Sequence, residues 1–103
     1  MMAVKTVTAA TVYPAEANIP SICYLVDTTS NDITIKLKEA GKCIGQTIFF
    51  KNLVAANSMC VSAASGETID GSGSLGTTTI YDQLEIVAGG TGVWHIVRNG
   101  TFA

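Results

Sequence analysis

The chain has 103 residues and a formal net charge of −2, and 48% of its residues are hydrophobic while only 14% are charged. This length suits one domain. Nucleic-acid affinity is carried largely by Lys and Arg, and the chain holds six of them, so we expect no nucleic-acid partner. No stretch approaches the ~18 apolar residues of a membrane span, and we expect no membrane partner. The low charge leaves more apolar surface than one core hides, which favours a homo-oligomer.

Residues 1–20 are predicted to form an N-terminal strand or arm, and residues 21–103 to form the β domain of a single-domain protein. The segment "VKTVTAATVY" is rich in Thr and Val but alternates poorly, and it ends at Pro14. A β-rich, poorly amphipathic segment favours pairing with a neighbouring protein. The one helix candidate, "YPAEANIP", is short and interrupted by proline. The candidate contact residues of the arm are Val4, Thr6, Val7, Thr8, Val12 and Tyr13.

The centre of the chain predicts strands. "NDITIKLK" places Ile33, Ile35 and Leu37 on one face, with polar residues between them. "SICYLVDT" precedes it, and "TTSND" supplies turn residues between the two. We therefore expect a hairpin between residues 22–27 and 33–38.

Further strands are predicted along the rest of the chain. In "CIGQTIFFKNL", Ile48 and Phe50 face one way and Phe49 faces the other. "SMCVSAA", "TTTIYDQLEIVAGG" and "GVWHIVRNG" follow with β-branched or alternating residues, and no internal repeat is visible. The pattern predicts an all-β fold, a single antiparallel β-sandwich or barrel-like domain.

The stretch "ETIDGSGSLG" contains the spacing G-x-G-x-x-G at Gly71, Gly73 and Gly76. A dinucleotide-binding turn needs a helix after these glycines, because the pyrophosphate sits on its N-terminus. Here "TTTIYDQLEIV" follows, which favours a strand. We therefore expect a tight turn and no cofactor. The candidate exposed loop comprises Asp70, Gly71, Ser72, Gly73 and Ser74.

No residue pattern selects a catalytic or metal site. The three cysteines lack a C-x-x-C pair and are expected to be free thiols. His95 stands alone in a strand pattern, and nothing in the sequence favours its pairing with Cys60 as a nucleophile. The acids that a glycosidase pair would need are expected to be solvated, and we expect no enzyme. These acids are Glu67, Asp70, Asp82 and Glu85.

The segment from Ser65 to Val97 resembles one that recurs in bacteriophage virion proteins, particularly tail-fibre and other surface-exposed β domains. The shared features are "ETIDGS", a Thr-rich strand, Tyr81 with alternating apolar residues, and a glycine followed by Trp94. The upstream "YLVDTTSNDITIKL" looks like the hairpin that usually precedes this segment. The resemblance implies a trimeric β domain on the phage particle, made in the host cytoplasm and carrying no cofactor.

Three functions are compatible with this resemblance. The chain shows no stalk, collagen-like repeat or N-terminal attachment module, so we expect it to clamp neighbouring subunits as a capsid decoration (cement) protein. Its partners would be the major capsid protein or other virion proteins. The alternative is a tail-fibre or tail-tip domain that binds a host glycan through Thr/Ser/Gly loops. A cell-wall hydrolase using Asp70 or Asp82 is the third, and we expect no such activity.

Overall fold

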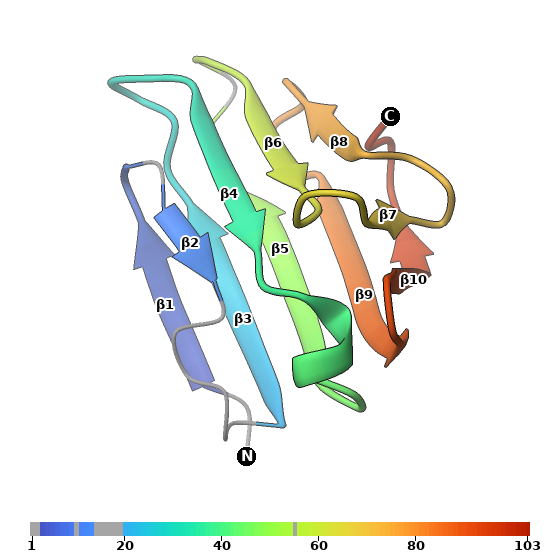
Figure 1. Cartoon of the computed structure of the whole chain (residues 1–103). Coiled ribbons are helices and arrows are strands. Elements are labelled where there is room, and N and C mark those ends of the chain that lie inside the picture. The colour runs from blue at the N-terminus through green and yellow to red at the C-terminus, as the bar shows by residue number, and fades with distance from the viewer. Residues whose placement is uncertain (1–2, 10, 14–19, 55) are drawn as a thin grey trace.

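The computed structural model describes residues 3–9, 11–13, 20–54 and 56–103. These residues form two packed β-sheets and one short 3-10 turn, Ala40–Lys42, with no α-helix among them (Figure 1). The expected all-β fold is confirmed. Within the same residues, no helix is long and apolar enough to cross a membrane. The helix candidate "YPAEANIP" falls largely outside the described residues.

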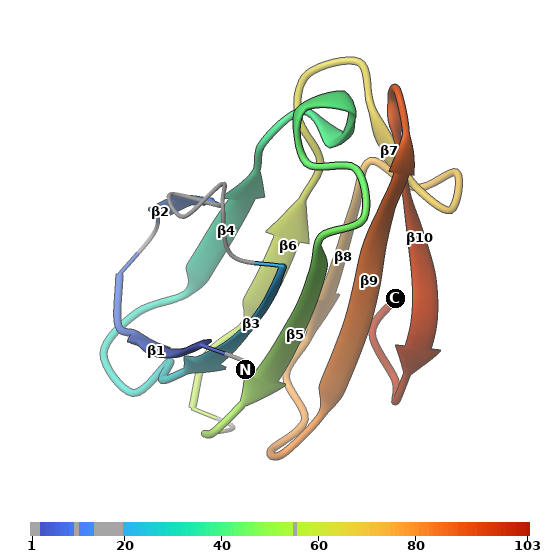
Figure 2. The ribbon, with the colours of Figure 1, turned by 90° about the horizontal axis from the view of Figure 1, so that it is seen from below.

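The two sheets lie face to face (Figure 2). Sheet A contains, in spatial order, β1 (Ala3–Val7), β3 (Ser21–Val26), β5 (Thr47–Asn52), β9 (Gln83–Gly90), β10 (Val93–Asn99) and β7 (Thr68–Ile69). Sheet B contains β2 (Thr11–Tyr13), β4 (Ile33–Leu37), β6 (Met59–Ser62) and β8 (Ser74–Thr77).

The first six strands form three stacked coils, where a coil is one strand in sheet A followed by one strand in sheet B. The coils are β1 with β2, β3 with β4, and β5 with β6, and equivalent strands of successive coils pair in parallel. Between the second and third coils the register is constant, so that each residue faces the one 26 positions later in both sheets. The later strands β8 and β9 then run antiparallel to β6 and β5.

This arrangement corrects three expectations. The strands at residues 22–27 and 33–38 do not form a hairpin, because the loop between them crosses from sheet A to sheet B. The sandwich is not antiparallel throughout, since each return to sheet A brings the next strand alongside the last in the same direction. A 26-residue structural repeat is present although the sequence shows none. Strand alternation identified the buried face but not the sheet that each strand joins.

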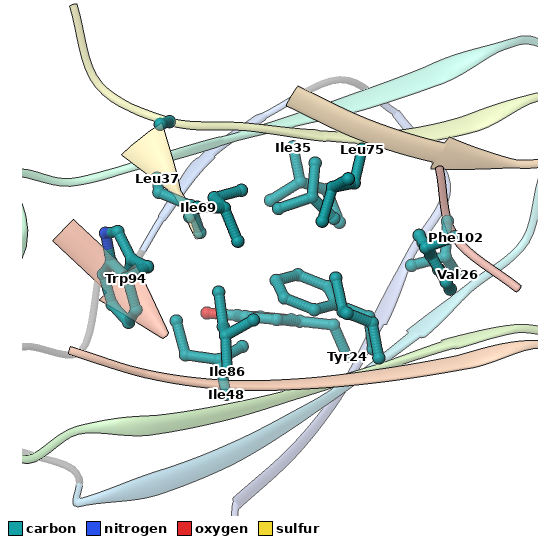
Figure 3. Packing of buried hydrophobic residues seen from close by; sticks show 14 of the residues in the cluster. Tyr24, Val26, Ile35, Leu37, Ile48, Ile69, Leu75, Ile86, Trp94 and Phe102 are labelled. Atoms are coloured by element: carbon teal, nitrogen blue, oxygen red, sulfur yellow. The ribbon is translucent and has the colours of Figure 1, made fainter. Parts of the chain in front are cut away.

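The core lies between the inward faces of the two sheets. Residues of β3 alternate half-buried and buried, and those of β4 alternate buried and exposed, as the period-two pattern predicts. Figure 3 shows Tyr24, Ile48 and Ile86 of sheet A opposite Ile35 and Leu75 of sheet B, with Trp94 and Phe102 toward opposite ends of the cluster. Trp94 is fully buried and Phe102 is 4% exposed. Each such side chain contributes roughly 2–3 kcal/mol by leaving water.

Polar side chains join the second and third coils at the corners that follow β3 and β5. The Thr28 hydroxyl is buried and donates to the Val54 carbonyl at 3.1 Å, and Asn57 Nδ2 donates to the Thr28 carbonyl at 2.6 Å. The Ser58 amide donates to Asp32 Oδ1 at 2.9 Å, which links positions 26 residues apart. The buried Thr28 hydroxyl therefore has a partner, and the stacking of the two loops fixes the crossing between sheets.

The end of the stack that contains the C-terminal segment is sealed. Gly76 and Ala103 exchange two backbone hydrogen bonds of 2.9 and 3.0 Å along the outer edge of β8. Asp82, which is 6% exposed, accepts hydrogen bonds from the hydroxyls of Thr77 and Thr101 and from the amides of Gln83 and Thr101. Burial acts to raise the pKa of Asp82, but these hydrogen bonds together lower it. The carboxylate thus ties the C-terminal segment to β8 and β9.

We predict that Asp82→Asn lowers the free energy of unfolding at pH 7 by about 1–3 kcal/mol, because a buried charged acceptor is lost. The pKa of Asp82 is lower in the folded state, so its stabilisation is present above about pH 4 and disappears as the pH falls through the folded pKa. Urea unfolding at pH 7 and at pH 3 measures both effects. A gap between wild type and variant as large at pH 3 as at pH 7 would contradict the assignment.

Candidate functional site

The "ETIDGS" stretch forms a two-residue turn at the sealed end. Ile69 and Ser72 exchange backbone hydrogen bonds of 2.7 and 3.0 Å around Asp70 and Gly71. Both central residues have positive φ, 46° for Asp70 and 87° for Gly71, as a type I′ turn requires. The chain then enters β8. The interpretation as a tight turn between strands is therefore confirmed.

Two other residues of the shared segment hold the connection between β4 and β5. Glu67 Oε1 accepts from the Ala40 amide at 2.9 Å, at the start of the 3-10 turn. Trp94 Nε1 donates to the Lys38 carbonyl at 3.3 Å. Glu67 and Trp94, which belong to the segment that carries the resemblance, therefore hold the backbone between β4 and β5 in place.

The candidate exposed loop is accessible but is already partly engaged. Asp70, Gly71, Gly73 and Ser74 are exposed and Ser72 is half-buried. Asp70 Oδ2 accepts from the Ile96 amide at 3.2 Å, and Asp70 Oδ1 lies 3.4 Å from His95 Nδ1. This carboxylate braces the turn against β10, and the loop presents mainly small side chains to solvent.

The residues predicted as an N-terminal arm belong to both sheets. β1 pairs with β3 and β2 pairs with β4, each in parallel. Val7 is 4% exposed, whereas Val4 is 61% exposed and Thr6 and Thr8 are also exposed. Val12 and Tyr13 lie in β2, paired with Lys36 and Leu37. The surface that this segment offers a neighbour is therefore the outer edge of the first coil.

The direction of the β1 backbone groups follows from one hydrogen bond. The Val7 carbonyl accepts from the Asp27 amide at 2.9 Å, so Val7 directs its backbone groups toward β3. Backbone groups of successive strand residues point in alternate directions within a sheet. Val4 and Thr6 therefore direct their N–H and C=O groups away from β3. Among the strands that the structure describes, sheet A ends at β1, so these groups form its open parallel edge.

The candidate chemical residues are not brought together. Cys60 lies on the outer face of sheet B and His95 on the outer face of sheet A, with the core between them. Asp82 is buried, and both oxygens of its carboxylate accept hydrogen bonds. This differs from the expectation of a solvated acid. The three thiols are free, with Cys43 buried and Cys23 and Cys60 half-buried. Among the described residues, no three His, Cys, Asp or Glu side chains cluster as metal ligands.

Two features of the sheet A surface were not predicted from sequence. Tyr81 has a φ of 61°, is 63% exposed, and has Lys51 Nζ 5.5 Å from its ring centroid. A hollow of about 160 Å³ lies on the outer face of sheet A, beside Phe49. Its lining includes Cys23, Lys51, Gln83, Glu85 and Arg98. Cross-strand register brings these residues together, and register is not visible in a single strand's pattern.

Comparison with protein-family models and with curated protein sequences finds no match to this chain.

Two glycines of the stretch provide a matched test of the turn. Gly71 has positive φ, whereas Gly73 does not, and at both positions an added Cβ would meet no atom within 4 Å. We predict that Gly71→Ala lowers the free energy of unfolding by about 1–2 kcal/mol through backbone strain. Gly73→Ala should change it by less than about 1 kcal/mol. Chemical denaturation of both variants checks this, and equal effects would refute the turn assignment.

Proposed function

We propose that the protein is a structural component of a bacteriophage virion, a capsid decoration protein that binds the outside of the head as a homotrimer. It works by covering junctions between coat subunits, and no covalent bond is made or broken. The resemblance of residues 65–97 to phage surface β domains supports this proposal. The observation that carries it is the difference between the two ends of the coil stack.

One end of the stack is suited to solvent and the other to a partner. At the sealed end, the C-terminal segment covers the edge of β8, β7 pairs with Val93 and Trp94 of β10, and the Ile96 amide beyond them donates to Asp70 Oδ2. Short or covered edges prevent strand addition. At the other end, β1 is a five-residue edge strand whose outward backbone groups lie at Val4 and Thr6. A coat-protein segment in extended conformation would add to sheet A here by backbone hydrogen bonding.

A second candidate function is favoured by Tyr81. A non-glycine residue with positive φ is strained, and such residues concentrate at binding sites. Tyr81 is exposed beside Lys51, and Ile80 next to it is 47% exposed. An aromatic ring next to a cation suits a host glycan or surface protein, as a tail-tip domain requires. Labelling the protein on particles separates the two: many copies over the head support decoration, and a few copies at the tail support adhesion.

We predict that Thr6→Pro abolishes binding to particles that lack the protein, because it removes an outward N–H while sparing the hydrogen bonds to β3. Proline is tolerated on an edge strand where its N faces away from the sheet. Thr6→Ala removes the side chain and keeps the N–H, so it should bind as wild type does. Co-sedimentation with particles measures binding, and thermal unfolding reports whether each variant is folded.

Val4→Pro provides a second variant, since the Val4 amide also points outward, and Val4→Ala is its control because it loses the exposed side chain and keeps the amide. Loss of binding in both proline variants, with binding retained in Thr6→Ala, supports the open edge as the contact. Wild-type binding by a folded proline variant would refute it. Failure of the wild-type chain to bind any part of the particle would refute the virion function itself.

A further inference from the structure

The outer faces of the two sheets differ in chemistry. On β4, β6 and β8 of sheet B the outward side chains are small or polar, among them Thr34, Lys36, Ser62 and Ser74. On sheet A the outward positions include a contiguous apolar group, of which one member is exposed and the others are half-buried within one chain. We name this group the sheet A patch, and it comprises Val4, Cys23, Leu25, Phe49 and Val87.

The register of sheet A makes the patch continuous. Val4, Cys23 and Phe49 lie side by side across β1, β3 and β5. Leu25 lies two positions along β3 from Cys23, and Val87 lies on β9 opposite Thr47. Side chains at directly opposite positions are about 5 Å apart and contact one another. A contiguous apolar group of this kind on a soluble domain marks an interaction surface.

The charged residues of the same face lie to one side of the patch. Lys51, Glu85 and Arg98 are placed on β5, β9 and β10, and Arg98 Nε is 3.7 Å from Glu85 Oε1. The hollow of about 160 Å³ lies between Phe49 and these residues. The apolar group is therefore bordered on one side by charged residues, with a recess for an incoming side chain between them, and apolar and polar areas adjoin in this way in protein–protein interfaces.

The size of the face suits a subunit interface. Five strands of sheet A, from β1 to β10, span about 24 Å at a spacing of roughly 4.8 Å, and five residues along a strand span about 17 Å. The projected area is therefore on the order of 400 Å². Its accessible area is larger because side chains roughen it, so the face supplies a large part of the roughly 800 Å² per partner of a standard interface.

We infer that a second copy of this chain covers the sheet A patch, and that this face is where the protein self-associates. The inference deepens the proposed homotrimer and rests on it for the number of copies. It leaves the open edge of β1 and the outer face of sheet B accessible. The virion contact is made by backbone groups along the edge of β1 and the subunit contact by side chains on the outer face of sheet A, and the two contacts meet at Val4.

Two substitutions test the patch without removing any buried side chain. Leu25→Glu places a carboxylate opposite Lys51, and Phe49→Lys places an ammonium opposite Glu85, so each new charge has an opposite charge across the strand. We expect both variants to fall from about three times the 10.7 kDa chain mass to the mass of one chain in light scattering. Thr34→Glu, on the outer face of sheet B, should retain the wild-type mass.

The cysteines give a second readout on the wild-type chain. Cys23 lies in the patch and Cys60 lies on the outer face of sheet B, and both are half-buried within one chain. Burial raises the pKa of Cys23 while Lys51 opposes this, so each thiol is compared only with itself across protein concentrations. Maleimide labelling of Cys23 should slow several-fold as the wild-type protein is concentrated, and labelling of Cys60 should not change.

Each result of the light-scattering and labelling experiments either supports or overturns the inference that a second copy covers the sheet A patch. A wild-type chain that is monomeric at every concentration, with Cys23 labelled at one constant rate, overturns it. Retention of the wild-type mass by folded Leu25→Glu and Phe49→Lys variants also overturns it, as does dissociation by Thr34→Glu. Mass and labelling are measured without phage particles. An oligomer that forms through this face but binds no particle would refute the virion function and leave the subunit interface standing.

Discussion

The constant parallel register between the second and third coils is the constraint on which the rest of the structure depends. Because β5 follows β3 and β6 follows β4 with the same 26-residue offset, the two sheets grow together and remain face to face. The offset also places Thr28, Asp32, Asn57 and Ser58 where they join the corner loops. A slip of one residue in either sheet would turn its apolar face outward and break these bonds.

The two ends of the stack of coils differ in structure. The third coil meets antiparallel strands, and the C-terminal segment is tied there by the buried carboxylate of Asp82. The first coil ends in the edges of β1 and β2. Because the two ends differ, the domain is asymmetric along the stacking axis, which is the line that runs from the first coil to the third. The sheet A patch runs parallel to that axis, whereas the edge of β1 lies at one end of it.

The sequence predicted most strands and the inward residues of several, because alternation such as Ile33, Ile35 and Leu37 depends only on neighbouring positions. It also predicted the turn at Asp70 and Gly71, whose residue types tolerate positive φ. It could not predict which strands pair, since the hydrogen bond from Trp94 to the Lys38 carbonyl joins residues 56 positions apart. Burial of Asp82 and the backbone of Tyr81 also depend on distant segments, and residue type alone suggests a solvated acid and an ordinary strand residue.

The 26-residue offset also has a consequence for the order in which the chain folds. Closing a loop of that length costs about 3 kcal/mol of chain entropy beyond a constant term, so pairing β3 with β5 is unfavourable until neighbouring coils offset it. Proteins dominated by such distant pairings fold slowly. Within the described part of the chain, β5 has a partner strand on each side whereas β1 has one, so the first coil contributes the least to holding the stack. A protein that pairs with β1 binds the chain only while this edge strand is folded. By mass action it therefore stabilises the first coil, which is the part of the chain that opens most easily.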